Sequence, residues 1–322
     1  MSENGSIAGI RNVTVVGGGV IGASWAALFL ARGLSVTVSD PQPGSDETVR
    51  GHIAQAAPAL KALGLDTSEL TARLAFEPDL ATAVRAADLV QENGPERLEV
   101  KHEMWRTIET NAPAGALFAT STSGIPASEI ATVLKDPGRL VVGHPFNPPH
   151  LVPLVEVVPG EGTSEETVER ARAFYAALGK RPQVLRKEVP GFVANRLQSA
   201  IFRECVHLVS EGVVTMQELD DIVTSSIGQR WAVAGPFRSF HLGGGEGGLP
   251  HFMSHLGIGM ERRWADMAQQ KVAFDEPTKQ LLTEQAEDFG GTIDELAAER
   301  DRKQIAVMRA LGDSFDSFDS GD

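Results

Sequence analysis

Apolar residues in the first part of the chain alternate between short β-rich runs and longer stretches with helical spacing. An alanine-rich stretch, Ile21–Arg32, predicts a helix, and a capping-box pattern at Thr163–Glu166 predicts the start of a second one that runs to Leu178. Strands that alternate with helices in this way imply a mostly parallel sheet with helices on both faces, an α/β fold. The runs that predict strands are Val13–Val16, Ser35–Ser39, Leu89–Gln91, Leu117–Ala119, Leu140–Gly143, Val155–Val158 and Gln183–Arg186.

The pattern changes at Pro190-Gly191, where the strand signals end. Long helical periodicity follows over Phe192–Glu211 and Gln217–Ser226, the second of them preceded by a capping-box pattern. The last residues are polar, acidic and small, a composition typical of disorder. We therefore predict an α/β domain at residues 1–188, an all-helical domain at 189–311 and a disordered acidic tail at 312–322.

Composition narrows the classes of partner. The 322 residues are 42% apolar and suit about two domains. A formal net charge of −14 argues against nucleic acid, which needs a concentrated basic surface. The single cysteine, Cys205, has no partner for an internal disulfide, which favours a reducing compartment. With neither a secretory signal nor a run of about 18 apolar residues, we expect a cytoplasmic protein without a membrane partner.

The first predicted strand leads into a glycine turn with the spacing G-x-G-x-x-G. Gly17 allows the tight turn, Gly19 lets the backbone approach a pyrophosphate, and Gly22 lets helix and strand pack closely. Val20 and Ile21 open the helix, whose first N–H groups and dipole favour phosphate. The strand before the turn and the helix after it complete the context of a Rossmann-type dinucleotide site.

Asp40 closes the second predicted strand, at the position where a carboxylate accepts hydrogen bonds from the adenosine ribose hydroxyls. A 2′-phosphate there would meet a like charge, and the next residue is Pro41 rather than an arginine. The sequence therefore favours NAD over NADP. An FAD site uses the same fingerprint and stays an alternative, as does a glycine turn in an unrelated α/β domain.

A histidine and a glutamate lie in successive strands past the midpoint. His144 ends one strand and Glu156 lies in the next, so neighbouring strands would bring them together at the edge where α/β sheets bind ligands. A carboxylate that orients a histidine makes it a general base. Each residue also has a plainer interpretation: His144 as a structural histidine and Glu156 as a solvated strand residue. No Cys–His cluster or HExxH motif indicates a metal, and we predict none.

Several motifs occur in the order found in the 3-hydroxyacyl-CoA dehydrogenase family, which this sequence resembles over most of its length. The motifs are Gly17-x-Gly19-x-x-Gly22, Ser121-Thr-Ser123, Gly143-His-Pro-Phe-Asn-Pro148, Glu156 and Pro190-Gly-Phe-Val-Ala-Asn195-Arg196. The resemblance implies that Ser123 and Asn195 contact the substrate oxygen and the histidine. It also implies that Glu96 and Lys101 lie beside the nicotinamide ribose. The alternatives are that Ser123 only caps the helix from Ile125 onward and that Asn195 is only a polar packing residue.

The resemblance implies an NAD-dependent dehydrogenase. In the mechanism that it implies, His144 removes the proton of a secondary alcohol, Glu156 offsets the resulting charge, and hydride leaves the same carbon. It further implies that the helical domain forms a homodimer interface and completes the cleft.

The substrate is indicated less directly. Residues 40–74 carry few basic groups for the phosphates of CoA. Stretches such as Gly228–Trp231 and Gly244–Met253 are similar to the L-carnitine dehydrogenase branch of the family, whereas Ala234–Phe237 is closer to the L-gulonate 3-dehydrogenase branch (lambda-crystallin). We therefore predict oxidation of a small, carnitine-like 3-hydroxy acid, L-carnitine to 3-dehydrocarnitine. L-gulonate and 3-hydroxybutyryl-CoA are the alternatives.

A trimethylammonium group favours aromatic faces and a carboxylate, and a substrate carboxylate favours an arginine. The candidates for these contacts are Arg230, Trp231, Glu246 and Phe252. The alternative for the two aromatic residues is the helical core. An alternative of a different class is a non-catalytic NAD-binding protein that kept the fold. The complete set of Ser123, His144, Glu156 and Asn195 favours the enzyme.

Overall fold

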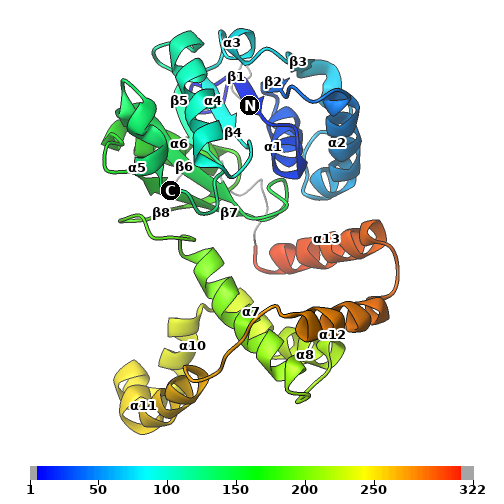
Figure 1. Ribbon diagram of the computed structural model, residues 1–322, viewed down its shortest axis with the longest axis vertical. Coiled ribbons are helices and arrows are strands. Elements are labelled where there is room, and N and C mark those ends of the chain that lie inside the picture. Colours follow the sequence, from blue (N-terminus) through cyan, green and yellow to red (C-terminus); the bar gives the residue numbers. More distant parts are fainter. Residues whose placement is uncertain (1–5, 313–322) are drawn as a thin grey trace. The chain divides into compact units, whose positions relative to one another are not determined.

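The computed structural model describes residues 6–312, and the predicted disorder after Gly312 lies outside them. By its contacts the chain divides into two compact units (Figure 1). Of the described residues, the first unit comprises 6–193 together with 298–312, and the second comprises Ala194–Ala297. The last helix thus belongs largely to the first unit, whereas the sequence pattern predicts one helical domain over residues 189–311.

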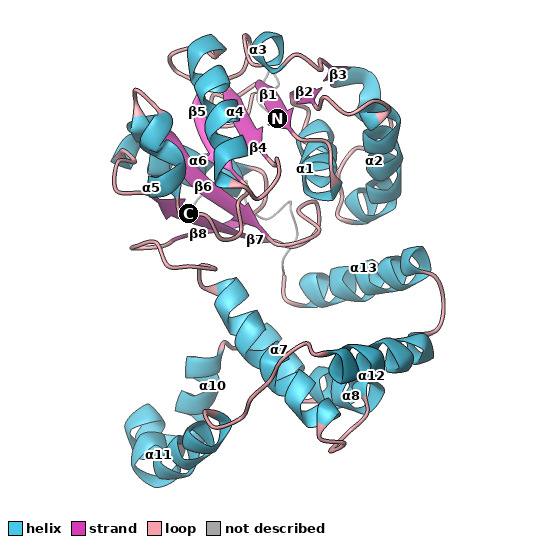
Figure 2. Cartoon of the chain, viewed as in Figure 1, coloured by secondary structure: helices cyan, strands magenta, loops and turns pink. Residues whose placement is uncertain are grey.

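The first unit contains an eight-stranded sheet in the order β3-β2-β1-β4-β5-β6-β7-β8 (Figure 2). Neighbouring strands are parallel except β6 and β7, which are antiparallel. The central strands are buried along their whole length, as their apolar runs predict. The strands are β1 Asn12–Val16, β2 Ser35–Ser39, β3 Leu74–Phe76, β4 Leu89–Glu92, β5 Leu117–Thr120, β6 Leu140–Pro145, β7 Leu154–Pro159 and β8 Arg181–Val184.

Helices cover both faces of this sheet. One core packs α1, α2 and α6 against one face, and the second packs α4 and its neighbours, with Trp105, Ile108 and Ile130, against the other. Gly17, Gly33 and Gly179 adopt the left-handed backbone conformation at turns between elements. The helices are α1 Val20–Ala31, α2 Ser45–Ala62, α3 Leu80–Ala83, α4 Leu98–Asn111, α5 Ala127–Ile130 and α6 Glu165–Ala177.

Two edge strands differ from the prediction. The strand β3 has only three residues, too few to show a periodicity, and it was not predicted. The strand β8 begins and ends two residues earlier than predicted and contains Pro182. A proline is tolerated here because β8 is an edge strand and needs fewer ladder hydrogen bonds.

The second unit is helical. Its helix α8 opens with the predicted capping box, in which Thr215 and Glu218 satisfy each other's backbone N–H groups. The preceding helix, α7, starts at Ala194 rather than Phe192, because Phe192 has a left-handed backbone. The helices are α7 Ala194–Ser210, α8 Met216–Ser225, α9 Ile227–Val233, α10 Pro236–Gly243, α11 Gly248–Met267 and α12 Glu276–Ala286.

The last helix, α13 (Ile293–Ala310), returns to the first unit over its second half. Ile305 and Met308 are each 5% exposed and belong to the core that contains α1 and α2. Arg309 donates a hydrogen bond to the carbonyl oxygen of Ala62 at the end of α2. Across residues 6–312, no helix combines the length and the apolar character needed to cross a membrane.

Candidate active site

The glycine turn after β1 has the close contacts that its spacing predicts. Gly17 has φ +91°, and a Cβ atom there would lie 2.7 Å from the carbonyl oxygen of Asn93. A Cβ at Gly22 would lie 1.9 Å from the carbonyl oxygen of Gly17, so no larger residue fits. A Cβ at Gly19, by contrast, would meet nothing within 4 Å. The turn thus packs tightly on its inner side and is open at Gly19.

The open side of the turn suits an anionic group. Gly19 is the N-cap of α1, and no side chain caps the first N–H groups of the helix. Val20, the first helical residue, is 53% exposed, and Ile21 is half-buried. Uncapped N–H groups at the positive end of a helix dipole bind phosphate. These residues therefore fit the pyrophosphate of a dinucleotide.

Asp40 holds the turn from the end of β2. One oxygen of its carboxylate accepts a hydrogen bond of 2.7 Å from the N–H of Gly18, and the other accepts one of 2.9 Å from Gln42. Asp40 also lines a groove of about 260 Å³ together with Phe76. The carboxylate thus lies between the glycine turn and a groove whose lining includes an aromatic side chain.

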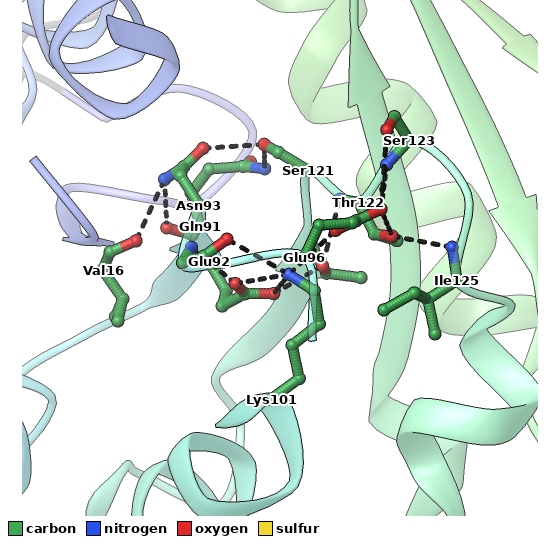
Figure 3. A network of polar contacts seen from close by, with 12 residues as sticks. Val16, Gln91, Glu92, Asn93, Glu96, Lys101, Ser121, Thr122, Ser123 and Ile125 are labelled. Carbon is green, nitrogen blue, oxygen red and sulfur yellow. Dashed lines mark hydrogen bonds and ion pairs between the residues drawn. The ribbon is translucent and has the colours of Figure 1, made fainter. Parts of the chain in front are cut away.

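A buried ionic network joins the ends of β4 and β5 (Figure 3). The ammonium of Lys101, on α4, lies 2.8 Å from Oε1 of Glu92 and 3.5 Å from Oε2 of Glu96. Glu92 also accepts hydrogen bonds from Thr120 Oγ1 at 2.5 Å and from the N–H of Gly94 at 2.6 Å. The Glu92 and Lys101 side chains are at most 1% exposed. This network fixes the loop after β4 to the start of α4.

Glu96 extends the network to the turn that carries Ser123 (Figure 3). Its Oε1 accepts hydrogen bonds from Thr122 Oγ1 at 2.6 Å and from the N–H groups of Ser123 and Gly124 at 2.9 and 3.0 Å. Burial raises the pKa of this carboxyl, but the Thr122 hydrogen bond, the charge of Lys101 and the backbone N–H groups outweigh burial and lower it. Glu96 therefore positions the Ser123 turn as an anion.

Thr122 rather than Ser123 caps the segment that follows. Thr122 Oγ1 accepts a hydrogen bond of 2.9 Å from the N–H of Ile125, the capping role considered for Ser123. The hydroxyl oxygen of Ser123 lies 3.5 Å from Oε1 of Glu96. The contact that caps this segment is thus made by Thr122 and not by Ser123.

A second set of polar contacts connects the same loop to α1. Ser121 Oγ donates to Asn93 Oδ1 at 2.7 Å and accepts from Gln91 Nε2 at 2.9 Å and Trp25 Nε1 at 3.2 Å. Gln91 in turn accepts a hydrogen bond of 2.7 Å from the buried hydroxyl of Tyr175. Burial raises the pKa of that Tyr175 phenol, so it stays protonated and acts as a donor.

His144 and Glu156 face each other across the antiparallel pair β6–β7, where they are register partners. The distance from His144 Nδ1 to Glu156 Oε2 is 2.9 Å, and the two residues are 5% and 2% exposed. A carboxylate on Nδ1 fixes the ring tautomer and leaves Nε2 as the basic nitrogen. Phe146 contacts the ring edge-on, with centroids 5.6 Å apart. The imidazole is thus buried, held by a carboxylate at one nitrogen and packed against an aromatic ring.

The loop between β6 and β7 is fastened at two places. His150 Nδ1 lies 2.8 Å from Ser24 Oγ on α1, and burial lowers the pKa of His150 to about 4. The ammonium of Lys180 donates hydrogen bonds to the carbonyl oxygens of Pro149 and Val152. Burial, with a smaller contribution from Arg32, lowers the pKa of Lys180 to about 7. Neither His150 nor Lys180 was predicted from the sequence.

The remaining predicted site residues lie in the second unit. Asn195 lies in the first turn of α7, Arg230 and Trp231 on α9, and Glu246 in the turn before α11. Phe252 packs on Phe240 with ring centroids 4.8 Å apart.

Phe252 lines a groove of about 330 Å³ in this unit. The other lining residues are Phe240, His255, Leu256, Gly259, Met260 and Arg263. Trp231, Arg230 and Glu246 are not part of this lining, so the groove does not assemble the predicted aromatic and acidic cage. The substrate contacts of these residues stay a prediction.

Sequence reasoning missed several members of the site because each is an ordinary residue at the end of a strand. Glu92 ends β4 and Thr120 ends β5, and parallel strands bring both to the ligand-binding edge of the sheet. That position was the signal that could have identified them. Among residues 6–312, no group of three or more His, Cys, Asp or Glu side chains is placed to hold a metal ion.

Comparisons with known proteins identify the family of both parts of the chain. A family model described as 3-hydroxyacyl-CoA dehydrogenase, NAD binding domain, matches residues 12–189. A second model, 3-hydroxyacyl-CoA dehydrogenase, C-terminal domain, matches residues 191–282.

Individual relatives are similar over nearly the whole chain. L-carnitine dehydrogenase from Streptomyces griseus subsp. griseus is 45% identical over 306 residues, which cover 94% of this chain and 90% of that protein. A Gibberella moniliformis protein named 3-hydroxyacyl-CoA dehydrogenase is 44% identical over 306 residues, covering 94% and 95%. The crystal structure of 5-formyl-3-hydroxy-2-methylpyridine 4-carboxylic acid 5-dehydrogenase, an NAD⁺-dependent dismutase, has a TM-score of 0.73 at 32% identity and covers 94% of this chain and 99% of that one.

These findings confirm the predicted fold class, the predicted family and NAD as the cofactor. The chain belongs to the 3-hydroxyacyl-CoA dehydrogenase family, whose members are NAD-dependent oxidoreductases acting on CH–OH groups.

Proposed function

We propose that this protein oxidises the 3-hydroxyl group of a small, carnitine-like 3-hydroxy acid, with His144 as the general base. The observation that supports the base is the 2.9 Å contact of a buried histidine with a buried carboxylate at the ligand-binding edge of the sheet. The similarity to several proteins named L-carnitine dehydrogenase supports L-carnitine, oxidised to 3-dehydrocarnitine, as the first substrate to test.

In the proposed mechanism, Nε2 of His144 accepts the proton of the substrate hydroxyl. Glu156 keeps the other ring nitrogen protonated and offsets the imidazolium charge. Ser123, held by Glu96, donates a hydrogen bond to the oxygen as it becomes a carbonyl, a role that we also assign to Asn195. NAD, when bound, supplies the hydride acceptor, and the turn at Gly19 with Asp40, Glu96 and Lys101 are the residues that would hold it.

A panel of substrates tests this proposal. Purified protein is mixed with NAD and L-carnitine, L-gulonate, 3-hydroxybutyrate or 3-hydroxybutyryl-CoA, and NADH formation is followed by absorbance. We expect turnover with L-carnitine. A preference for L-gulonate or for the CoA thioester would replace the substrate and keep the reaction class. The relative named 3-hydroxyacyl-CoA dehydrogenase makes the thioester the second candidate.

The base is tested by His144→Gln, which keeps a polar side chain of similar size. We expect turnover to fall by about a thousandfold or more, since general base catalysis contributes about 10²–10⁴-fold and the oriented contact is lost. NADH binding, measured by fluorescence, should be retained. Absence of NADH formation with every substrate in the wild type would support a non-catalytic NAD-binding protein instead. A cytoplasmic location and a homodimer remain predictions.

A further inference from the structure

The turn that precedes α7 contains a strained residue. Phe192 has φ +49°, and Ala8 is the other non-glycine residue with positive φ in the part of the chain that the structure describes. The N–H group of Phe192 donates a hydrogen bond of 3.0 Å to the carbonyl oxygen of Val189, and the preceding residue, Gly191, has φ +75°. Bulky side chains rarely adopt this left-handed conformation, and it persists where the surroundings impose it, often at functional sites.

Packing imposes the conformation on Phe192. The residue is 1% exposed and forms a small core with Ala127, Val142 and Val158. Val142 and Val158 are register partners on β6 and β7, the two strands that carry the His144–Glu156 pair. The aromatic ring is therefore anchored to the same strands as the catalytic pair.

The same turn contacts both members of that pair. The ring centroid of Phe192 lies 5.4 Å from that of His144, with the rings tilted by 52°. The N–H group of the next residue, Val193, donates to Glu156 Oε1 at 3.0 Å, while Glu156 Oε2 holds His144 at 2.9 Å. Two adjacent residues of one turn thus fix the imidazole ring and the carboxylate that orients it.

We propose that Phe192 is a positioning residue for His144, and that its left-handed backbone conformation serves to bring the ring against the imidazole. The proposal rests on the proposed role of His144 as the base. A single hydrogen bond at Nδ1 fixes one edge of the imidazole but allows it to tilt about that bond. Phe192, together with Phe146, removes this freedom. At an extended or helical φ, the Cβ of residue 192 would point in another direction.

Phe192→Leu is the main test, because it keeps an apolar side chain but loses the flat ring. We expect kcat to fall by about tenfold or more, since small displacements of a reacting group cost rate steeply. The KM for NAD should stay within about twofold, and the isotope effect with substrate deuterated at the reacting carbon should increase, because the chemical step becomes slower.

Phe118→Leu is the matched control for the loss of a buried ring. Phe118 is fully buried, packs on Trp105 with the rings tilted by 44°, and pairs with Leu140, the first residue of β6. The Phe118→Leu variant should be less stable than the wild type but keep a kcat within about twofold of the wild-type value. Phe192→Gly, which accepts a left-handed φ without strain, should still lose kcat, because the ring rather than the backbone conformation acts on His144.

If the wild type is active and the folded Phe192→Leu variant keeps a kcat within about twofold of the wild-type value, the proposal is overturned. If the wild type oxidises none of the substrates, the proposed function fails by itself. The positioning role is then tested by the ring ¹⁵N signals of His144, assigned by their loss in His144→Gln. These signals should shift in Phe192→Leu, and unchanged signals would overturn the proposal. Phe192→Met, with a side chain of closer volume, replaces Phe192→Leu if the latter does not fold.

Discussion

Replacing Lys101 by methionine should strongly destabilise the NAD-binding domain. The Lys101 ammonium lies 2.8 Å from Glu92 Oε1, with side chains 1% and 0% exposed. At an effective dielectric constant of about 20, this distance corresponds to an attraction of about 6 kcal/mol, which offsets the desolvation of two charges. Lys101→Met leaves the Glu92 carboxylate buried without its counter-charge. We therefore expect the free energy of unfolding to fall by about 3–5 kcal/mol.

Two further variants isolate the cause. Glu92→Gln/Lys101→Met removes both charges and should recover much of the loss, because no unpaired ion remains buried. Lys279→Met is the surface control, since Lys279 lies 2.7 Å from Glu276 but the two side chains are 55% and 88% exposed. It should cost about 1 kcal/mol or less. Urea unfolding followed by circular dichroism and tryptophan fluorescence measures all three differences.

A Lys101→Met loss no larger than that of Lys279→Met would refute this reasoning. It would mean that the hydrogen bonds from Thr120 and Gly94 stabilise the Glu92 carboxylate without a counter-charge. A double variant as unstable as Lys101→Met would refute the electrostatic cause specifically, and would indicate that packing of the lysine stem carries the effect.

Two other predictions concern the glycine turn and the loop between β6 and β7. Gly19→Ala should fold with nearly wild-type stability, since its Cβ meets no protein atom within 4 Å, yet weaken NADH binding by at least about tenfold in a fluorescence titration. Gly22→Ala should instead lower the melting temperature, because its Cβ would lie 1.9 Å from a carbonyl oxygen, and the opposite ranking would contradict the turn geometry. Burial lowers the pKa of His150 from 6.5 to about 4, so the unfolded chain binds a proton before the native protein does, and stability falls as pH decreases from 6.5 towards 4. His150 thus contributes on the order of 3 kcal/mol to the pH dependence of the free energy of unfolding. In urea titrations over this pH range, His150→Asn should therefore lose less stability than the wild type. If the two proteins lose stability in parallel, His150 is not responsible.

Local sequence patterns were sufficient for the regular parts of the fold. The apolar runs of the central strands and the glycine spacing at Gly17–Gly22 are properties of neighbouring residues, so they can be read without tertiary contacts. Edge strands were predicted less well. The strand β3 is too short for a periodicity, and β8 contains a proline, Pro182, that only an edge position accepts.

The residues of the candidate site likewise fall into those that the sequence predicted and those that it did not. His144 and Glu156 were identified because each lies on a recognisable strand, and a short connection between two strands makes them neighbours. Lys101 and Glu96 were predicted from the resemblance alone, whereas their buried partners Glu92 and Thr120 were not predicted. No local pattern marks a charged residue as buried, because burial depends on the elements that pack over it.

The sequence by itself determined the α/β class, the NAD-binding turn and the histidine–glutamate pair. Only the tertiary structure decided what holds these residues in place. Phe192 is an ordinary aromatic residue in the sequence, and its left-handed conformation follows from packing against residues far along the chain. Lys180 likewise reaches carbonyl groups about thirty residues away. Such contacts depend on the way distant segments meet, because backbone strain and desolvation are sustained only where surrounding packing offsets their cost.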